Sequence, residues 1–139
     1  MTLVLDASAA VKLVAEEPDS LLVRGMVGSA LVVAPDLVLA EVANALWRKA
    51  RLGAIGATEA RAAQTSLPGL FTRLVPLRLL QDQALDLALR RDHPAYDCFY
   101  VALAMREAAP LLTADRRIAQ RFGGDVEVRL PMARAAADR

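Results

Sequence analysis

The chain has 139 residues, a formal net charge of +1 and one cysteine, Cys98. This length suits a single domain, and a hydrophobic content of 55% is enough to build a core, which excludes intrinsic disorder. One cysteine excludes a disulfide framework and a cysteine-built zinc site. Uncharged stretches such as residues 25–35 are too short to span a membrane, and no basic segment precedes an apolar run as in a secretory signal. We therefore expect a soluble cytoplasmic protein without a membrane partner.

Short apolar runs alternate with helical patterns along the chain. In chain order, the predicted elements are a strand at 2–5, helices at 8–15 and 18–25, a strand at 30–34, helices at 35–52 and 58–67, a strand at 73–79, helices at 82–90 and 95–108, a strand at 110–113, a helix at 115–121 and a strand at 126–130. Pro35 is expected to begin its helix, and Thr58 is expected to cap the next one.

Apolar strands that alternate with helices are typical of a parallel sheet covered on both faces. The predicted fold is a three-layer α/β/α sandwich with a central, mostly parallel sheet. It forms a single domain over residues 1–130, and the tail at 131–139 is expected to be loosely ordered. Ligands of such folds bind beyond the carboxyl ends of the strands, so polar residues directly after a strand are candidate site residues.

Two acidic residues come directly after predicted strands. Asp6 follows the first strand, with Ser8 two residues later, and Asp115 follows the strand at 110–113. Either aspartate can equally be an N-cap of the next helix. If the two strands are neighbours in the sheet, both side chains point into one crevice.

Two further acidic residues lie inside apolar helical segments. Glu41 has apolar neighbours on both sides, which predicts a helix buried around most of its circumference, and Asn44 lies on the same helical face. Asp97 lies near the start of another apolar helix. Backbone donors, an arginine or the helix dipole can satisfy such acids, but a buried, unpaired carboxylate costs several kcal/mol.

Four carboxylates that converge would repel one another unless a cation bound them. The candidate ligands are oxygen atoms, with no set of His and Cys residues, so the expected metal is Mg²⁺ or Mn²⁺ rather than zinc. A divalent cation lowers the pKa of water and clamps phosphate oxygens, which makes phosphodiester hydrolysis the natural reaction for such a cluster.

Four short segments together resemble the motifs of the PIN-domain family. They are LVLDAS at 3–8, AEVAN at 40–44, YDCFY at 96–100 and LTAD at 112–115. Within this family the chain is most similar to the VapC toxins of bacterial and archaeal toxin–antitoxin pairs, over about residues 2–128. Each motif is weak alone, but four in this order and spacing are specific.

The resemblance implies a Mg²⁺- or Mn²⁺-dependent endoribonuclease. Its catalytic, metal-binding residues would be Asp6, Glu41, Asp97 and Asp115, and its supporting polar residues would be Ser8, Asn44 and Thr113. It also implies a homodimer and a VapB-type antitoxin whose C-terminal segment blocks the active-site groove. The RNA that is cut (a tRNA, a ribosomal RNA or an mRNA) and the use of one metal or two stay open.

Basic residues near the predicted site are candidate RNA contacts. They are Arg48, Lys49, Arg51, Arg116 and Arg117, which can equally be solvated charges that complement helix ends. His93, beside Pro94, is expected to be structural. The aromatic residues Trp47, Phe99 and Tyr100 are expected to be core or dimer contacts rather than stacking platforms.

Two other functions compete with RNA cleavage. One is a PIN-like module that binds RNA or metal without cutting, although such a relative would be expected to lack part of the acidic set. The other is a phosphoacceptor or small phosphatase that uses Asp6. That chemistry usually needs a nearby lysine, and only Lys12 and Lys49 are available.

Overall fold

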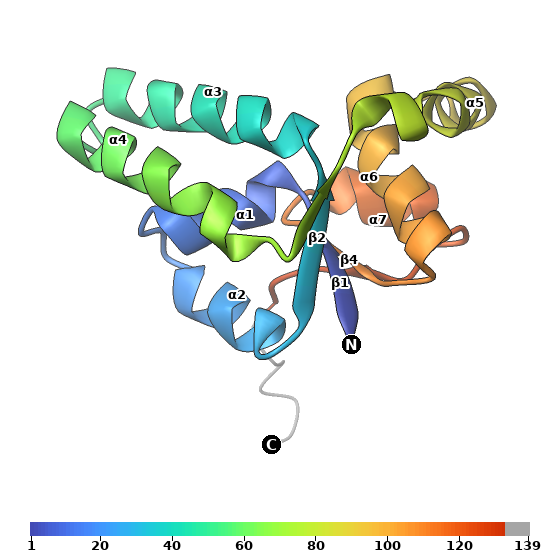
Figure 1. The fold of residues 1–139 in the computed structure, drawn as a ribbon, viewed down its shortest axis with the longest axis horizontal. Helices are drawn as coiled ribbons and strands as arrows, with labels where there is room; N and C mark the ends of the chain where they lie inside the picture. Colours follow the sequence, from blue (N-terminus) through green and yellow to red (C-terminus); the bar gives the residue numbers. More distant parts are fainter. Residues whose placement is uncertain (133–139) are drawn as a thin grey trace.

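Five short strands form one parallel sheet in the computed structural model, which describes residues 1–132 (Figure 1). They are β1 (Thr2–Leu5), β2 (Leu31–Pro35), β3 (Arg73–Val75), β4 (Leu111–Leu112) and β5 (Val128–Arg129). The order across the sheet is β3-β2-β1-β4-β5, and every neighbouring pair is parallel. The predicted parallel sheet is confirmed, and β1 lies at its centre.

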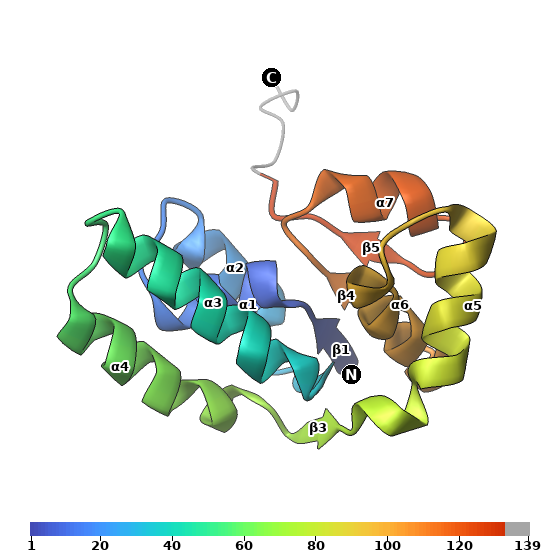
Figure 2. The same cartoon turned by 90° about the horizontal axis from the view of Figure 1, so that it is seen from above.

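Helices cover both faces of this sheet. One layer holds α1 (Ala7–Val14), α2 (Ser20–Val27), α3 (Leu37–Arg51) and α4 (Ala57–Ser66), and the other holds α5 (Gln81–Arg91), α6 (Ala95–Glu107) and α7 (Arg116–Phe122) (Figure 2). Right-handed crossovers explain the division, because the chain moves from β1 toward β3 through the first layer and back toward β5 through the second. The predicted three-layer sandwich is confirmed.

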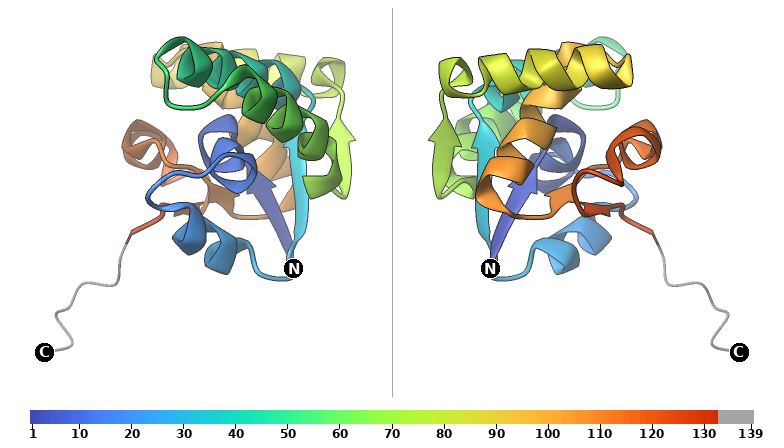
Figure 3. Two further views of the ribbon diagram at one scale, coloured as in Figure 1. Left: turned by 90° about the vertical axis from the view of Figure 1, so that its left-hand side faces the viewer. Right: turned by 90° about the vertical axis from the view of Figure 1, so that its right-hand side faces the viewer.

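The strand order reverses between β1 and β4, which makes this pair the switch point of the sheet. Val4 is in register with Leu111 and Leu5 with Leu112, so the residues that follow the two strands emerge side by side. Open parallel sheets bind ligands at such a point, beyond the carboxyl ends of the strands. In both views of Figure 3, α3 and α5 lie at this end of the molecule, opposite the N-terminus.

The core surrounds β1 and α6. Leu3, Val4 and Leu5 are fully buried, because helices cover both faces of their strand. In α6 a continuous run from Tyr100 to Ala104 is buried, as expected for a helix that packs against β1 and β2 on one side and α5 on the other. β1 and α6 therefore belong to the same hydrophobic core.

The structure corrects several predicted boundaries. Pro35 ends β2, in register with Val75, instead of beginning α3. The predicted strand at 73–79 stops at Val75, because Pro76 has no N–H for the ladder, and residues 77–79 form a 3₁₀ turn. The N-cap of α4 is Gly56 rather than Thr58.

The predicted tail lies mostly outside the described residues, because its positions 133–139 are not among them. Within residues 1–132, no helix has both the length and the apolar character that a membrane crossing requires.

Candidate functional site

Asp6 occupies the switch point of the sheet with only 5% of its surface exposed. Its Oδ1 accepts hydrogen bonds from Ser8 Oγ at 2.6 Å and from the Ala9 N–H at 3.0 Å, and its Oδ2 accepts one from the Thr113 hydroxyl. Asp6 is thus both the N-cap of α1 and the centre of a polar cluster, so the two roles that the sequence allows are combined.

The cluster around Asp6 is fixed by the backbone after β4. Ser8 Oγ accepts the Ala114 N–H at 2.9 Å, and Thr113 Oγ1 accepts the Asp115 N–H at 3.0 Å. Each hydroxyl therefore uses its proton for Asp6 and its lone pairs for the neighbouring loop. Burial raises the pKa of Asp6 to about 6, although the hydrogen bonds from Ser8 and Thr113 partly oppose this effect.

Glu41 lies in the first half of α3 and is half-buried. Its Oε1 accepts a hydrogen bond of 2.6 Å from the hydroxyl of Tyr100, a buried residue of α6. Asn44, from which we expected this support, forms no such bond with Glu41. Burial raises the pKa of Glu41, and the Tyr100 hydroxyl partly offsets this rise.

Asp97 lies in the first turn of α6 and pairs with His93, which precedes that helix. His93 Nε2 and Asp97 Oδ2 are 2.7 Å apart. The imidazole is buried and packs edge-on against Phe122, with ring centroids 5.1 Å apart. His93 therefore has the structural role that the sequence suggests and, in addition, directly orients a candidate site carboxylate.

Three carboxylates interact electrostatically across the switch point. In addition to burial, the charge of Asp97 raises the pKa of both Asp6 and Glu41. Burial, followed by the charge of Glu41, also raises the pKa of the Tyr100 hydroxyl, which stays protonated and acts as a donor. Asp6, Glu41 and Asp97 thus form an acidic trio contributed by the residue after β1, by α3 and by α6.

Asp115 is held differently from this trio. Its carboxylate accepts hydrogen bonds from the Arg117 backbone N–H at 2.9 Å and from the Arg117 guanidinium at 2.9 and 3.2 Å, and it is the N-cap of α7. These contacts with Arg117 lower the pKa of Asp115. The strand neighbours β1 and β4 bring Asp6 and Asp115 to the same edge of the sheet, as expected, but Asp115 carries its own counterion.

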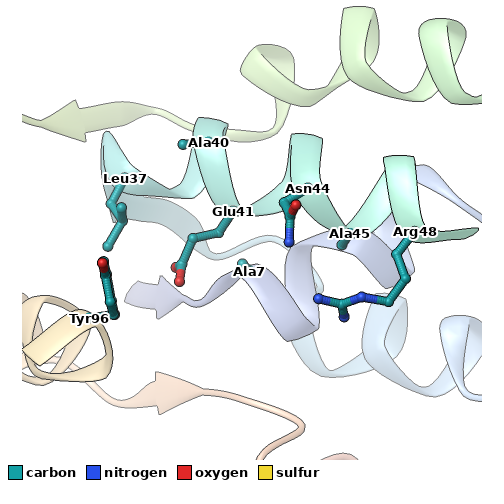
Figure 4. Close-up of a pocket in the computed structure, with 8 residues that line it drawn as sticks. All are labelled: Ala7, Leu37, Ala40, Glu41, Asn44, Ala45, Arg48 and Tyr96. Carbon is teal, nitrogen blue, oxygen red and sulfur yellow. The ribbon is translucent and has the colours of Figure 1, made fainter. Parts of the chain in front are cut away.

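A groove of about 400 Å³ opens beside the acidic trio (Figure 4). Its lining residues are Ala7, Leu37, Ala40, Glu41, Asn44, Ala45, Arg48 and Tyr96. Glu41 therefore faces an open groove on one side and Tyr100 on the other. The expectation that α3 is buried around most of its circumference is wrong, because Leu39, Ala40 and Trp47 are exposed.

The five predicted RNA contacts have different surroundings. Arg48 lines the groove, whereas Lys49 forms an ion pair with Glu17. The Arg51 guanidinium lies 5.6 Å from the centre of the Trp47 ring, which is exposed rather than part of the core. Arg117 is paired with Asp115, and Arg116 is exposed without an ion pair among residues 1–132.

Both lysines of the chain form ion pairs with acidic residues other than Asp6. Lys12 Nζ lies 2.7 Å from Glu17 and from Asp19, and Lys49 pairs with the other oxygen of Glu17. This network joins α1, the loop after it and α3. It leaves the phosphoacceptor function without a lysine beside Asp6.

The donor set of the acidic trio fits a hard divalent cation. All candidate ligands are carboxylate oxygens, and the raised pKa of buried Asp6, about 6, reflects an anionic charge that a cation would stabilise. As the side chains stand, no three His, Cys, Asp or Glu residues within 1–132 are close enough to form a complete metal site. Ligation by Asp6, Glu41 and Asp97 would therefore require the side chains to adjust.

Two partners of the trio have only indirect signals in the sequence. Tyr100 lies three residues after Asp97, which puts it on the same face of α6, but its contact with Glu41 depends on packing between distant helices. His93 lies four residues before Asp97, although it precedes the helix. A polar group at helical spacing from a candidate carboxylate was the signal available in both cases.

Comparisons with known proteins agree with the motifs. A family model described as "PIN domain" matches residues 3–123. Ribonuclease VapC1 of Mycobacterium tuberculosis is 38% identical over 130 residues, which cover 91% of this chain and 96% of the relative.

Solved structures share the fold. The crystal structure of a Pyrobaculum aerophilum protein has a TM-score of 0.68 and 27% identity, covering 91% of this chain and 92% of that one. The structure of VapBC2 from Rickettsia felis, bound to a DNA fragment from its promoter, has a TM-score of 0.64. It covers 94% of this chain and 98% of that one at 14% identity, so it supports the fold alone.

Proposed function

The chain belongs to the PIN-domain family as a VapC-type member, and from this premise we propose that it is a Mg²⁺- or Mn²⁺-dependent endoribonuclease. The single observation that carries this proposal is the acidic trio of Asp6, Glu41 and Asp97 at the switch point of the sheet. The ribonuclease name of a relative that is 38% identical over most of the chain gives independent support.

Asp6, Glu41 and Asp97 would hold the cation directly or through water. When bound, a divalent cation neutralises charge on the scissile phosphate and lowers the pKa of water. Ser8 and Thr113 orient the Asp6 carboxylate, Tyr100 orients Glu41, and His93 orients Asp97. Such hydrogen bonds keep the ligands in place before substrate arrives.

Asp115 would complete the acidic set from the edge of the trio. Its bond to Arg117 holds the carboxylate in its ionised form, because the guanidinium lowers its pKa. Asp115 is therefore suited to hydrogen-bond water near the scissile phosphate. Arg117 would in turn be positioned to contact the RNA backbone beside the trio.

The protein partners follow from the family. We propose that the chain is the toxin of a VapBC-type toxin–antitoxin pair, inhibited by a VapB-type antitoxin and assembled as a homodimer. The family match and the name of the VapC1 relative support the toxin, and the antitoxin is proposed from the same family membership. The RNA substrate is proposed to be a tRNA or a ribosomal RNA.

Cleavage of a pool of total tRNA and ribosomal RNA by the purified, antitoxin-free protein tests the activity. The reaction is run with Mg²⁺ or Mn²⁺, with EDTA, and with Asp97→Asn. Asp82→Asn is the matched control, because it removes the same charge from an exposed position on α5. Discrete fragments that need both the metal and Asp97, and that persist in Asp82→Asn, are the expected result.

A folded protein that leaves all these RNAs intact would favour the non-cleaving alternative. Cleavage by Asp97→Asn at the wild-type rate would contradict the catalytic assignment itself. Circular dichroism of each variant ensures that a loss of cleavage does not reflect a loss of the fold.

A further inference from the structure

Tyr96 and Arg48 lie at opposite ends of the groove that Glu41 lines (Figure 4). Glu41 and Asn44 lie between them on the same face of α3. Arg48 lies seven positions after Glu41, a separation of about 10 Å along the helix. The groove thus runs from an aromatic ring, past a carboxylate of the acidic trio, to a cation.

Tyr96 is an exposed aromatic residue next to a candidate catalytic carboxylate. It lies one residue before Asp97 in the first turn of α6, and 66% of its surface is exposed. Its hydroxyl has no hydrogen bond within residues 1–132. An aromatic face in this setting offers a stacking surface to an unpaired base, and such stacking tolerates any sequence.

Arg48 is the cation of this groove that has no partner in the described part of the chain. Its neighbours Lys49 and Arg51 are engaged with Glu17 and with the Trp47 ring. A planar guanidinium with five donors suits a phosphate group. Asn44, one turn earlier on α3, is exposed and brings an amide that both donates and accepts hydrogen bonds.

The groove continues beyond Arg48 into a second cavity of about 440 Å³. Ala45 and Arg48 line both cavities, and the second is also lined by Lys12 and Lys49. Glu17 also lines the second cavity and forms ion pairs with both lysines, so Arg48 is the cation on this side without an ion pair among residues 1–132.

We propose that this groove binds single-stranded RNA, with a base stacked on Tyr96, a phosphate bound by Arg48 and Asn44 hydrogen-bonded to the strand between them. The inference rests on the proposed RNA substrate and defines how it is held. An unpaired strand is favoured over a duplex, because a base can stack on Tyr96 only if it is splayed out. The combination of cation, amide and aromatic ring favours RNA over an apolar peptide.

Equilibrium binding in EDTA tests this inference separately from cleavage. The probes are a short fluorescent single-stranded RNA of mixed sequence and an abasic ribose-phosphate strand of the same length, followed by anisotropy. The variants are Tyr96→Leu and Arg48→Gln. Their matched controls are Tyr96→Phe, which keeps the ring, and Arg61→Gln, which removes the same charge from an exposed position on α4.

Tyr96→Leu is expected to weaken RNA binding roughly ten-fold while leaving the abasic strand unaffected. Arg48→Gln is expected to weaken binding of both strands and to reduce the slope of log K against log salt by about 0.7. Both controls are expected to bind like the wild type.

Several outcomes would overturn the groove assignment. These are wild-type protein that does not bind the RNA, or Tyr96→Leu and Arg48→Gln proteins that bind it normally. If the two variants bind RNA normally but no longer co-purify with the cognate antitoxin, the groove belongs to the protein partner instead. If the wild type shows the expected binding pattern but never cleaves RNA, the proposed nuclease activity is refuted, whereas the proposed RNA-binding role of the groove stands.

Discussion

Tyr100 Oη donates a hydrogen bond of 2.6 Å to Glu41 Oε1, which joins two residues 59 positions apart in the chain. The phenol is almost fully buried in α6, while Glu41 lies on α3 with one side open to the groove. Tyr100 thus fixes a half-buried carboxylate from the core side and leaves its other oxygen available to a ligand.

Tyr100→Phe removes this donor and keeps the ring in the core. We expect the free energy of unfolding to fall by about 2 kcal/mol at neutral pH, because the charged Glu41 carboxylate loses a hydrogen bond from the Tyr100 hydroxyl. Urea unfolding measures this change. Tyr96→Phe is the matched control, since the exposed Tyr96 hydroxyl is unbonded within residues 1–132, and equal stability of the two variants would contradict the role assigned to Tyr100.

The buried Asp6 carboxyl predicts a pH-dependent stability in the absence of metal. Its pKa in the folded protein is about 6 and its ordinary value is 3.8, so the native state binds the proton more tightly than the unfolded chain does. The contribution of Asp6 is fully present below its unfolded pKa and is lost as the pH rises toward about 6. The loss amounts to about 3 kcal/mol.

Asp6→Asn, which cannot ionise, is the reference for this effect. We expect the free energy of unfolding of the wild type, relative to that of Asp6→Asn, to fall as the pH rises from about 4 to about 6 in EDTA. It should stay constant above that range. A difference between the two proteins that does not change with pH would show that Asp6 titrates normally.

Glu17 forms ion pairs with both lysines of the chain, and its removal would leave Lys12 with Asp19 alone and the partly buried Lys49 without its partner. We expect Glu17→Gln to lower the free energy of unfolding by about 2 kcal/mol at neutral pH. Glu16→Gln provides a matched control, because its ion pair with Arg24 is on the surface and contributes less than about 1 kcal/mol. Thermal unfolding compares the two, and similar melting temperatures would argue against a structural role for the network.

Much of the fold follows from the periodicity of the sequence. The strands are short apolar runs, and the helices between them have a polar side, so the alternation predicts a parallel sheet with two covering layers. The errors occur where one residue decides a boundary. Pro35 fits a helix start as well as a strand end, and only the pairing with Val75 distinguishes the two.

The sequence also predicts part of the candidate site. Asp6 and Asp115 follow strands, and Glu41 and Asp97 interrupt apolar helices, so local patterns single them out. Their partners depend on contacts between distant segments. Asn44 was expected beside Glu41 from helical spacing, but the hydrogen bond comes from Tyr100 on another helix. The pairing of Asp115 with Arg117 spans only two positions, but the sequence equally allowed a solvated Arg117, so the structure was needed to show this contact.

We propose that Asp6, Glu41 and Asp97 form one cation site while Asp115 lies at its edge. Calorimetric titration of Mn²⁺ into the wild-type, Asp97→Asn and Asp115→Asn proteins at neutral pH tests it most directly. We expect Asp97→Asn to weaken Mn²⁺ binding by more than about 100-fold and Asp115→Asn by less than about ten-fold. Wild-type protein that binds no Mn²⁺, or Asp97→Asn protein that binds it with wild-type affinity, would contradict the account.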